Sequence, residues 1–307
     1  MDGAASPAML ASWMRALFAC LACVFATIAC GGSPRTGSTD GGVPAGDGPA
    51  IDGGGGAIDS GNPVPAGVLR TSFVTADSYS SGGVEQTIVI AGFYDQEPEP
   101  LSVTEETVGP CTVDTVVFLE GGAFPRYADL GAITVTGGAH DVTLAFGAGG
   151  YAPFNEPSAL WAGGETLTFA ASGAEVGAFE ATVTAPAHVT MTAPTLPIGS
   201  DLVVDRAADL VLAWTGTSPG DVVVRLDGPQ ELPMPQVSIA CAFPAADGAG
   251  TIPAAALSRI EPVGRGTIGA EVVSRTTASV PDWGAVEIAA TASVLGRGRW
   301  GTSVELR

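Results

Sequence analysis

Most of the chain after residue 68 alternates apolar and polar residues with a period of two, and this pattern constrains the fold more than any other feature. The runs 113–120, 142–146 and 179–184 place an apolar residue or threonine at every second position. Glycine pairs such as Gly121-Gly122 separate these runs. Short alternating strands divided by glycine turns are typical of antiparallel sandwiches or barrels. The sequence therefore predicts an all-β protein.

The second half of the chain repeats this pattern in longer rows. Alternation recurs in residues 210–214, 222–226, 237–243 and 286–294, and only residues 251–257, with Pro253 near the start, favour a short helix.

We predict two tandem antiparallel β-sandwich domains, at residues 68–186 and 187–307, with a hinge at Thr184–Ala187. Alternation alone does not distinguish two sandwiches from one larger fused sheet, so that alternative stays open.

A short apolar segment near the N-terminus predicts where the protein is located. Arg15 precedes the apolar run Ala16–Ala29, whose length of about 14 residues is below the roughly 20 that a membrane-spanning helix needs. Its length and its flanking residues suit the apolar region of a signal peptide. Ala29-Cys30-Gly31 then looks like a bacterial lipobox, so residues 1–29 would be a lipoprotein signal peptide and Cys30 the lipidation site. Plain secretion and a true membrane helix are the alternatives.

Residues 30–67 form a Gly/Asp/Pro-rich segment with almost no side chains to bury, so we expect a flexible tether. Asp40, Asp47, Asp52 and Asp59 invite a calcium interpretation, but they lack the D-x-D-x-D-G spacing of an EF-hand loop. Solvated linker residues are the preferred interpretation.

Composition bears on the kind of partner that the chain can bind. The formal net charge is -20, and all basic residues are arginine because the chain contains no lysine. Nucleic-acid binding needs a basic surface, which this chain does not have. We therefore expect no nucleic-acid partner.

Two cysteines remain in the predicted mature protein. Cys20 and Cys23 would leave with the signal peptide and Cys30 would carry lipid, which leaves Cys111 and Cys241. A cell-envelope location permits a disulfide. Because one cysteine falls in each predicted domain, we expect two separate buried thiols rather than a bridge.

Motifs that resemble catalytic or nucleotide-binding sequences have plain structural interpretations. Residues 216–220 match G-x-S-x-G, but both histidines precede Ser218 and a strand follows it, so we expect a hairpin turn. Residues 264–269 and 296–301 match G-x-G-x-x-G without a following helix that could hold a pyrophosphate. His140 and His188 lack partners at metal-ligand spacing, and we expect them in loops.

Acidic and aromatic residues of the first half suggest weaker alternatives. Glu105-Glu106 and the acidic stretch 95–100 are expected in solvated loops, although paired carboxylates in a hydrolase remain an alternative. Asp201, Asp205 and Asp209 could serve a calcium-dependent adhesion module. Aromatic residues beside glycine or proline could form a carbohydrate-binding platform, with ordinary packing as the competing interpretation; they are Tyr79, Phe93, Tyr94, Tyr127, Tyr151, Phe154 and Trp161.

Residues 197–226, above all the stretch 208–216 with Trp214, resemble the region of strands B and C in immunoglobulin and fibronectin type III-like domains. The resemblance implies that Trp214 packs in a sandwich core. The paired cysteines of antibody domains are missing. With its lipobox, tether and Val/Thr-rich β-domains, the whole chain resembles lipoproteins of the myxobacterial type, which implies an envelope location and no particular functional residue.

These observations predict a non-enzymatic, lipid-anchored cell-envelope protein that serves as a binding or structural module. We expect no catalytic residue, no cofactor and no metal site. The expected partners are the membrane, through the N-terminal lipid, and an envelope protein or glycan.

Replacement Cys30→Ala tests the predicted anchor. In the native host, the wild-type protein should fractionate with membranes and have the intact mass of a chain that begins at acylated Cys30. The variant should leave the membrane fraction, because several acyl chains at about 0.8 kcal/mol per buried CH₂ provide the attachment. A soluble, unmodified wild-type protein would contradict the prediction.

Overall fold

The computed structural model shows an all-β protein with almost no helix, as the sequence predicts. It describes residues 71–81, 84–94, 101–118, 126–147, 149–195, 201–229, 235–261, 265–281, 283–294 and 302–307. The predicted signal peptide, Cys30 and the tether lie outside these residues.

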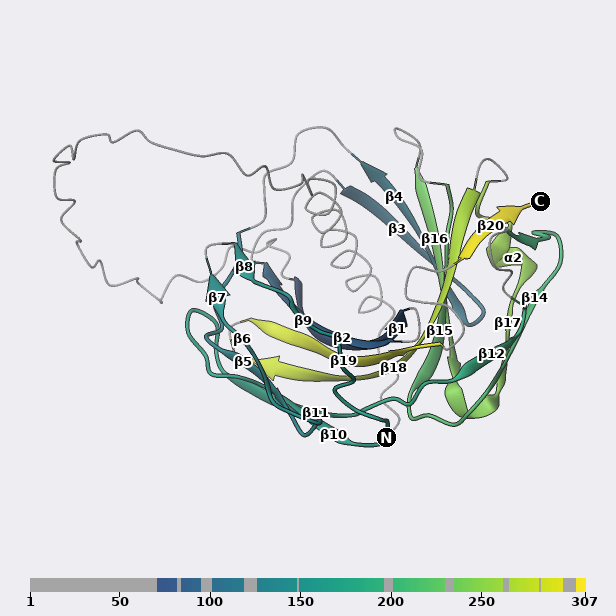
Figure 1. Cartoon of the computed structure of the whole chain (residues 1–307). Helices are drawn as coiled ribbons and strands as arrows, with labels where there is room; N and C mark the ends of the chain where they lie inside the picture. The colour runs from purple at the N-terminus through teal and green to yellow at the C-terminus, as the bar shows by residue number, and fades with distance from the viewer. Residues whose placement is uncertain are drawn as a thin grey trace, which may run out of the picture.

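One sheet of eleven strands dominates the structure (Figure 1). Its main path runs β3-β4-β16-β15-β18-β19-β1-β2-β9, and β20 joins β13 to β18. The strands in chain order are β1 (Thr71–Ser81), β2 (Val84–Tyr94), β3 (Leu101–Val108), β4 (Cys111–Phe118), β9 (Phe154–Glu156), β13 (Leu202–Val204), β15 (Asp221–Asp227), β16 (Gln236–Pro244), β18 (Arg265–Val280), β19 (Gly284–Ser293) and β20 (Thr302–Leu306). Neighbours are antiparallel except for the parallel pairs β1–β19 and β13–β20.

Two smaller antiparallel sheets pack on the large one, with the order β11-β10-β5-β6 in the first and β12-β14-β17 in the second. Their strands are β5 (Ile133–Thr136), β6 (Val142–Leu144), β10 (Thr166–Ala171), β11 (Phe179–Thr184), β12 (Thr190–Ala193), β14 (Leu210–Thr215) and β17 (Ala249–Ile252). A short pair, β7 (Phe146–Gly147) and β8 (Gly150–Tyr151), and two short helices, η1 (Ala245–Asp247) and α2 (Ala254–Leu257), complete the described elements. Helix α2 confirms the helix expected after Pro253.

Both small sheets cover the same face of the large sheet, which we call the first face. On β18, Ala278 and Val280 belong to one hydrophobic core, whereas Ile268 and Val272 belong to the other. All four residues have even numbers, and alternate residues of a strand point to the same side. Figure 1 shows β10 and β11 against β18 and β19, and β12, β14 and β17 beside the opposite end of the sheet.

Burial accounts for the alternation seen in the sequence. The first core contains Phe93, Ile133, Leu160 and Phe169, each at most 1% exposed. In the second core, Trp214 is buried, as its resemblance to a strand-C tryptophan implies, and its Nε1–H donates to the Ala245 carbonyl at 2.8 Å. Burial of side chains of this size contributes about 1.5–3 kcal/mol each.

The division into two consecutive domains is not reflected in the strand pairing. Strand β1 pairs with β19, and β4 pairs with β16, so strands from residues 68–186 and 187–307 share the large sheet. Of the two alternatives that the sequence left open, one fused sheet describes this pairing. Alternation could not reveal it, because alternation fixes which side chains face a core and not which strands are neighbours.

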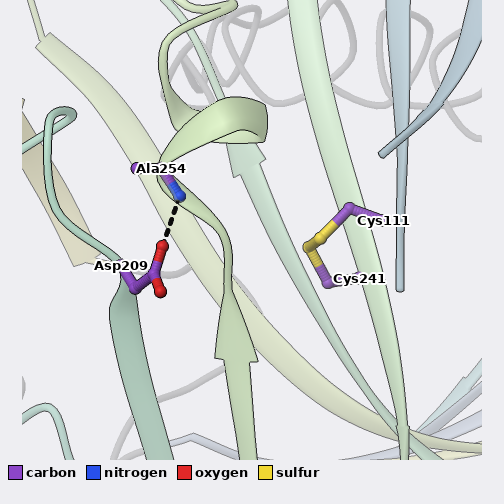
Figure 2. Close-up of a disulfide and its surroundings, with 4 residues drawn as sticks. All are labelled: Cys111, Asp209, Cys241 and Ala254. Atoms are coloured by element: carbon purple, nitrogen blue, oxygen red, sulfur yellow. Dashed lines mark hydrogen bonds between the residues drawn. A yellow bond between two sulfur atoms is a disulfide. The ribbon is translucent and has the colours of Figure 1, made fainter. Parts of the chain in front are cut away.

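Cys111 and Cys241 form a disulfide, so the expectation of two separate thiols is wrong. The two cysteines are directly opposite in the register of β4 and β16, with their Cα atoms 4.0 Å apart (Figure 2). They are separated by 130 residues in the sequence and fully buried in the second core. The expectation failed because it assigned the two cysteines to different domains, whereas their strands are neighbours.

Replacement of both Cys111 and Cys241 by alanine should lower the free energy of unfolding by about 2–5 kcal/mol, because the bridge closes a long loop in the unfolded chain. Urea unfolding measures the loss. The wild-type protein should lose similar stability in reductant, whereas the double variant should not respond to reductant. A wild-type midpoint that reductant leaves unchanged would contradict the assignment.

Candidate functional site

The side of the large sheet opposite both cores, which we call the second face, is the candidate functional site. Both small sheets and α2 contribute to cores on the first face. Many residues of the second face are themselves buried, among them Asp77, Asp114 and Val273, whereas Thr267 and Thr277 of β18 are exposed. Two small apolar clusters lie on it: Val223, Val273, Ala289 and Ala242, and separately Phe73, Tyr94 and Ile90. Every member of both clusters comes from a strand of the large sheet itself.

Charged residues surround these clusters, and most of them are acidic. The strand register assigns eight carboxylates and three arginines to the second face: Asp77, Glu105, Asp114, Asp221, Asp227, Glu271, Glu287 and Glu305, with Arg225, Arg265 and Arg275. A sheet face that combines short apolar side chains with an excess of carboxylates can bind a ligand that is apolar in part and positively charged.

One cross-strand row concentrates this negative charge. Glu105 is opposite Asp114, Asp114 is opposite Ser238, and Ser238 is opposite Asp227. The Ser238 hydroxyl donates to Asp227 Oδ1 at 2.6 Å. Like charges directly opposite each other in a sheet are destabilising, so carboxylates in such a row depend on hydrogen-bond or ionic partners, of which Ser238 is one.

Arg275 and Thr291 provide partners for carboxylates of the second face. Arg275 lies 3.7 Å from Asp221 and 3.9 Å from Glu287. Burial raises the pKa of Glu287 from its ordinary 4.5 to about 7, although the Arg275 charge acts in the opposite direction. On the neighbouring strand pair, the Thr291 hydroxyl donates to Asp77 Oδ1 at 2.6 Å.

The G-x-S-x-G motif forms a turn, although not the hairpin that we predicted. It connects β14 to β15, which belong to different sheets. The Ser218 hydroxyl accepts a hydrogen bond from the Ala187 N–H at 2.8 Å and lies 3.0 Å from the Pro219 carbonyl, to which it donates. Gly220 has a φ of +87°, and an added Cβ would meet the Val273 carbonyl oxygen at 2.2 Å. These contacts account for the glycine and serine without catalysis.

The other motifs also have local structural roles. The first G-x-G-x-x-G match runs into β18, and the second overlaps residues outside the described part. His140 contacts Glu156 at 2.6 Å. His188 hydrogen-bonds the Ser293 carbonyl at 2.7 Å through Nδ1.

The residues suggested for calcium-dependent adhesion have separate partners. Asp201 pairs with Arg265 at 2.9 Å. Asp205 accepts a hydrogen bond from the Ala207 N–H, and Asp209 accepts one from the Ala254 N–H at the start of α2 (Figure 2). Within the described ranges, no three histidine, cysteine or carboxylate residues are grouped so that they could hold a metal ion. Asp40, Asp47, Asp52 and Asp59 lie outside those ranges.

The aromatic residues of the first half confirm the packing interpretation rather than the carbohydrate platform. Phe93, Tyr151 and Trp161 are buried in the first core, and Phe154 packs against it. Tyr127 is 37% exposed, and its ring lies 5.1 Å from that of Tyr94. The rings therefore do not form one exposed face.

The expectation that Glu105-Glu106 lies in a loop is wrong, because both residues belong to β3. Glu105 then faces the acidic row, whereas Glu106 is ion-paired with Arg259. Within β15, alternation alone puts Arg225 and Asp227 on the side away from the buried even-numbered residues. It gave no signal that carboxylates of distant strands would gather on one face, since that depends on strand order.

Comparisons with known proteins add little. No protein-family model and no curated protein matches the chain. Among solved structures, it is similar to a Ca²⁺-stabilized adhesin of an Antarctic bacterium that binds ice, with 14% identity, 69% of this chain and 56% of that chain covered, and a TM-score of 0.15. The chain thus spans little more than half of that protein. A 1.5-MDa bacterial ice-binding adhesin gives 12% identity, 70% and 74% coverage and a TM-score of 0.15. Neither likeness is strong enough to bear on function.

The raised pKa of Glu287 predicts a pH dependence of stability. The folded state holds a proton that the unfolded state releases above pH 4.5, so the stability of the wild-type protein should fall as pH rises from about 4.5 to 7. The loss should reach about 3 kcal/mol at most. Glu287→Gln should remove this loss, whereas Glu180→Gln on the exposed side of β11 should retain it.

Urea unfolding at pH 5 and pH 8 measures the difference. If the wild-type protein and the Glu287→Gln variant change equally between these pH values, the raised pKa is wrong.

Proposed function

We propose that this protein is a lipid-anchored cell-envelope protein that binds a partner through the second face of its large sheet and catalyses no reaction. The observation that carries the proposal is the second face itself, which gathers carboxylates and two apolar clusters from distant strands and has exposed residues such as Thr267 and Thr277 on β18. The predicted lipid at Cys30 would attach the chain to the membrane. The predicted tether of residues 30–67 would give the folded part reach from the membrane surface.

The described part of the chain contains no helix with the length and apolar character that crossing a bilayer requires. Other features support binding. The residues suggested for glycan binding or calcium-dependent adhesion are occupied by packing, capping and ion pairs. The carboxylates of the second face lie in extended strands with partners such as Ser238 and Arg275, which suits recognition. The fold is all-β, and we extend it in this proposal to a sandwich-like, immunoglobulin-type module.

Photocrosslinking in the native host tests the proposal. A photoreactive amino acid at Thr267 or Thr277, both exposed on the second-face side of β18, should give a discrete adduct of higher mass with an envelope partner. Thr143 and Glu180, exposed on the outer side of the first small sheet, are matched control positions and should give none.

Adducts at the control positions alone, or at none of the four positions, would contradict binding through the second face. Membrane fractionation of the same cells shows independently whether the protein is anchored. The two parts of the proposal can therefore fail separately.

A further inference from the structure

The outer edge of β3, at one end of the large sheet, is a second surface at which a partner can bind. We propose that β3 accepts an added antiparallel strand, an extended segment of another protein in which lysine or arginine alternates with apolar residues. The main chain of that segment would hydrogen-bond to β3, and one of its cationic side chains would lie opposite Glu105. Binding at this edge goes beyond binding through the second face and does not require it.

The hydrogen bonds of β4 indicate which backbone groups of β3 point outward. On the far side of β4, the Ala242 N–H donates to the Pro110 carbonyl at 3.2 Å, so the even-numbered residues of β4 bond to β16. Cys111 and Cys241 show the close Cα spacing, 4.0 Å, of opposite residues that do not hydrogen-bond each other. The odd-numbered residues of β4 therefore bond to the even-numbered residues of β3. The N–H and C=O groups that point away from β4 belong to Leu101, Val103, Glu105 and Thr107.

Strand β3 differs from the other edge strands that the structure describes. It pairs with β4 over eight consecutive residue pairs without a register shift. Every other sheet edge among the described strands is shorter: β7 and β8 have two residues each, β6, β9 and β13 have three, β12 and β17 have four, and β11 has six. The pairing of β12 also contains a register shift. Short or irregular edges discourage the addition of a strand, whereas a long, regular edge permits it.

The side chains of β3 leave its edge accessible. Thr104, Glu106 and Thr107 are exposed, and Val103 and Glu105 are half-buried. No proline lies within the strand, so every residue of β3 keeps its backbone N–H. An approaching segment therefore meets a continuous row of donors and acceptors.

The two glutamates of β3 select the charge of the partner. Glu106 lies on the first-face side and is ion-paired with Arg259, whereas Glu105 lies on the second-face side. Charged residues on an edge strand discourage pairing with segments that do not neutralise them. Opposite charges directly across a strand pair are stabilising. A lysine or arginine opposite Glu105 meets this requirement.

The alternation of side chains then gives the pattern of the partner. Residues of an added strand opposite Val103, Glu105 and Thr107 would lie on the second-face side. Their neighbours would lie on the first-face side, where Val108 packs against the second core and offers apolar contact. Cationic and apolar residues should therefore alternate along the partner.

The same charge disfavours two other occupants. A second copy of the chain would bring its own Glu105 and Glu106, with a net charge of -20, to the edge. The predicted tether of residues 30–67 is acidic and rich in glycine and proline, which are depleted in strands. A cationic segment of another protein avoids both disadvantages.

A labelled peptide of about ten residues, the upper length of an ordinary strand, that alternates lysine and valine is the probe. Binding to the purified full-length chain is followed by fluorescence anisotropy at 0.15 M salt, where attraction between distant charges is screened. Two N-methylated forms of the peptide, with equal charge and composition, isolate the main-chain contacts. Methylation at the lysines removes the N–H groups that face β3 when lysine is opposite Glu105, whereas methylation at the valines removes those that point away. The lysine-methylated form should bind at least tenfold more weakly than the valine-methylated form, because main-chain hydrogen bonds supply the affinity of an added strand.

Matched variants of the chain locate the contact. Glu105→Gln should weaken binding of the unmethylated peptide at least threefold, whereas Glu180→Gln, which removes the same charge from the exposed side of β11, should change it less than twofold. Thr107→Pro removes one outward-pointing N–H and no hydrogen bond to β4, and it should also weaken binding. The methylated peptides are compared on the wild-type protein, so that comparison remains informative if a variant folds poorly.

Absence of binding by the unmethylated peptide would overturn the proposal, as would lysine-methylated peptide that binds as tightly as the valine-methylated form. Equal weakening by Glu105→Gln and Glu180→Gln would also overturn it, since attraction would then come from net charge alone. If the full-length chain dimerises in sedimentation and Thr107→Pro abolishes the dimer, a second copy occupies β3 and the proposed partner is wrong. Crosslinks from Thr267 and Thr277 report on the second face, so the proposed function is tested separately.

Discussion

Strand β18 connects the parts of this fold. Its 16 residues pair with β15 and β20 at one end and with β19 along most of its length. Its even-numbered side chains enter both hydrophobic cores, while its odd-numbered side chains cross the second face. Since successive residues of a strand point to opposite sides, a shift of one residue in β18 would empty both cores and bury charged side chains instead. The register of this strand therefore fixes both the cores and the candidate site.

The same constraint gives the second face its chemistry. The two small sheets cover the first face, so the apolar side chains on that side of the long strands are buried. The alternate side chains of the same strands lie on the second face. These second-face side chains include Asp77, Glu287, Asp221 and Asp227, with short apolar residues between them. The register of the long strands thus gathers carboxylates and small apolar side chains from distant parts of the chain on one sheet surface.

The sequence predicted the elements well because alternation reports directly on burial. The rows around Val222–Leu226 and Val286–Val294, the helix after Pro253 and the buried Trp214 all follow from local pattern. Strand order does not follow from local pattern. Neither the pairing of β1 with β19 nor that of β4 with β16 can be read from either segment alone. The sequence therefore did not predict the disulfide and could not choose between two sandwiches and one fused sheet.

The candidate site was hidden for the same reason. Its acidic residues come from strands as distant in sequence as β1 and β19, and each looks like an ordinary solvent-facing residue in its own segment. Asp114 and Asp227 lie on opposite sides of the predicted domain boundary. Their strands, β4 and β15, are nevertheless both neighbours of β16, where Ser238 lies between the two aspartates. A site built from side chains of several strands can be recognised only once the order of those strands is known.

Calorimetric unfolding of the full-length, disulfide-bonded chain tests most directly whether one sheet unites the two halves. Because β18 contributes to both cores, the account predicts a single transition with equal calorimetric and van't Hoff enthalpies. Two separate transitions, with one that persists in an isolated fragment of residues 187–307, would show that the halves fold independently and would contradict the account.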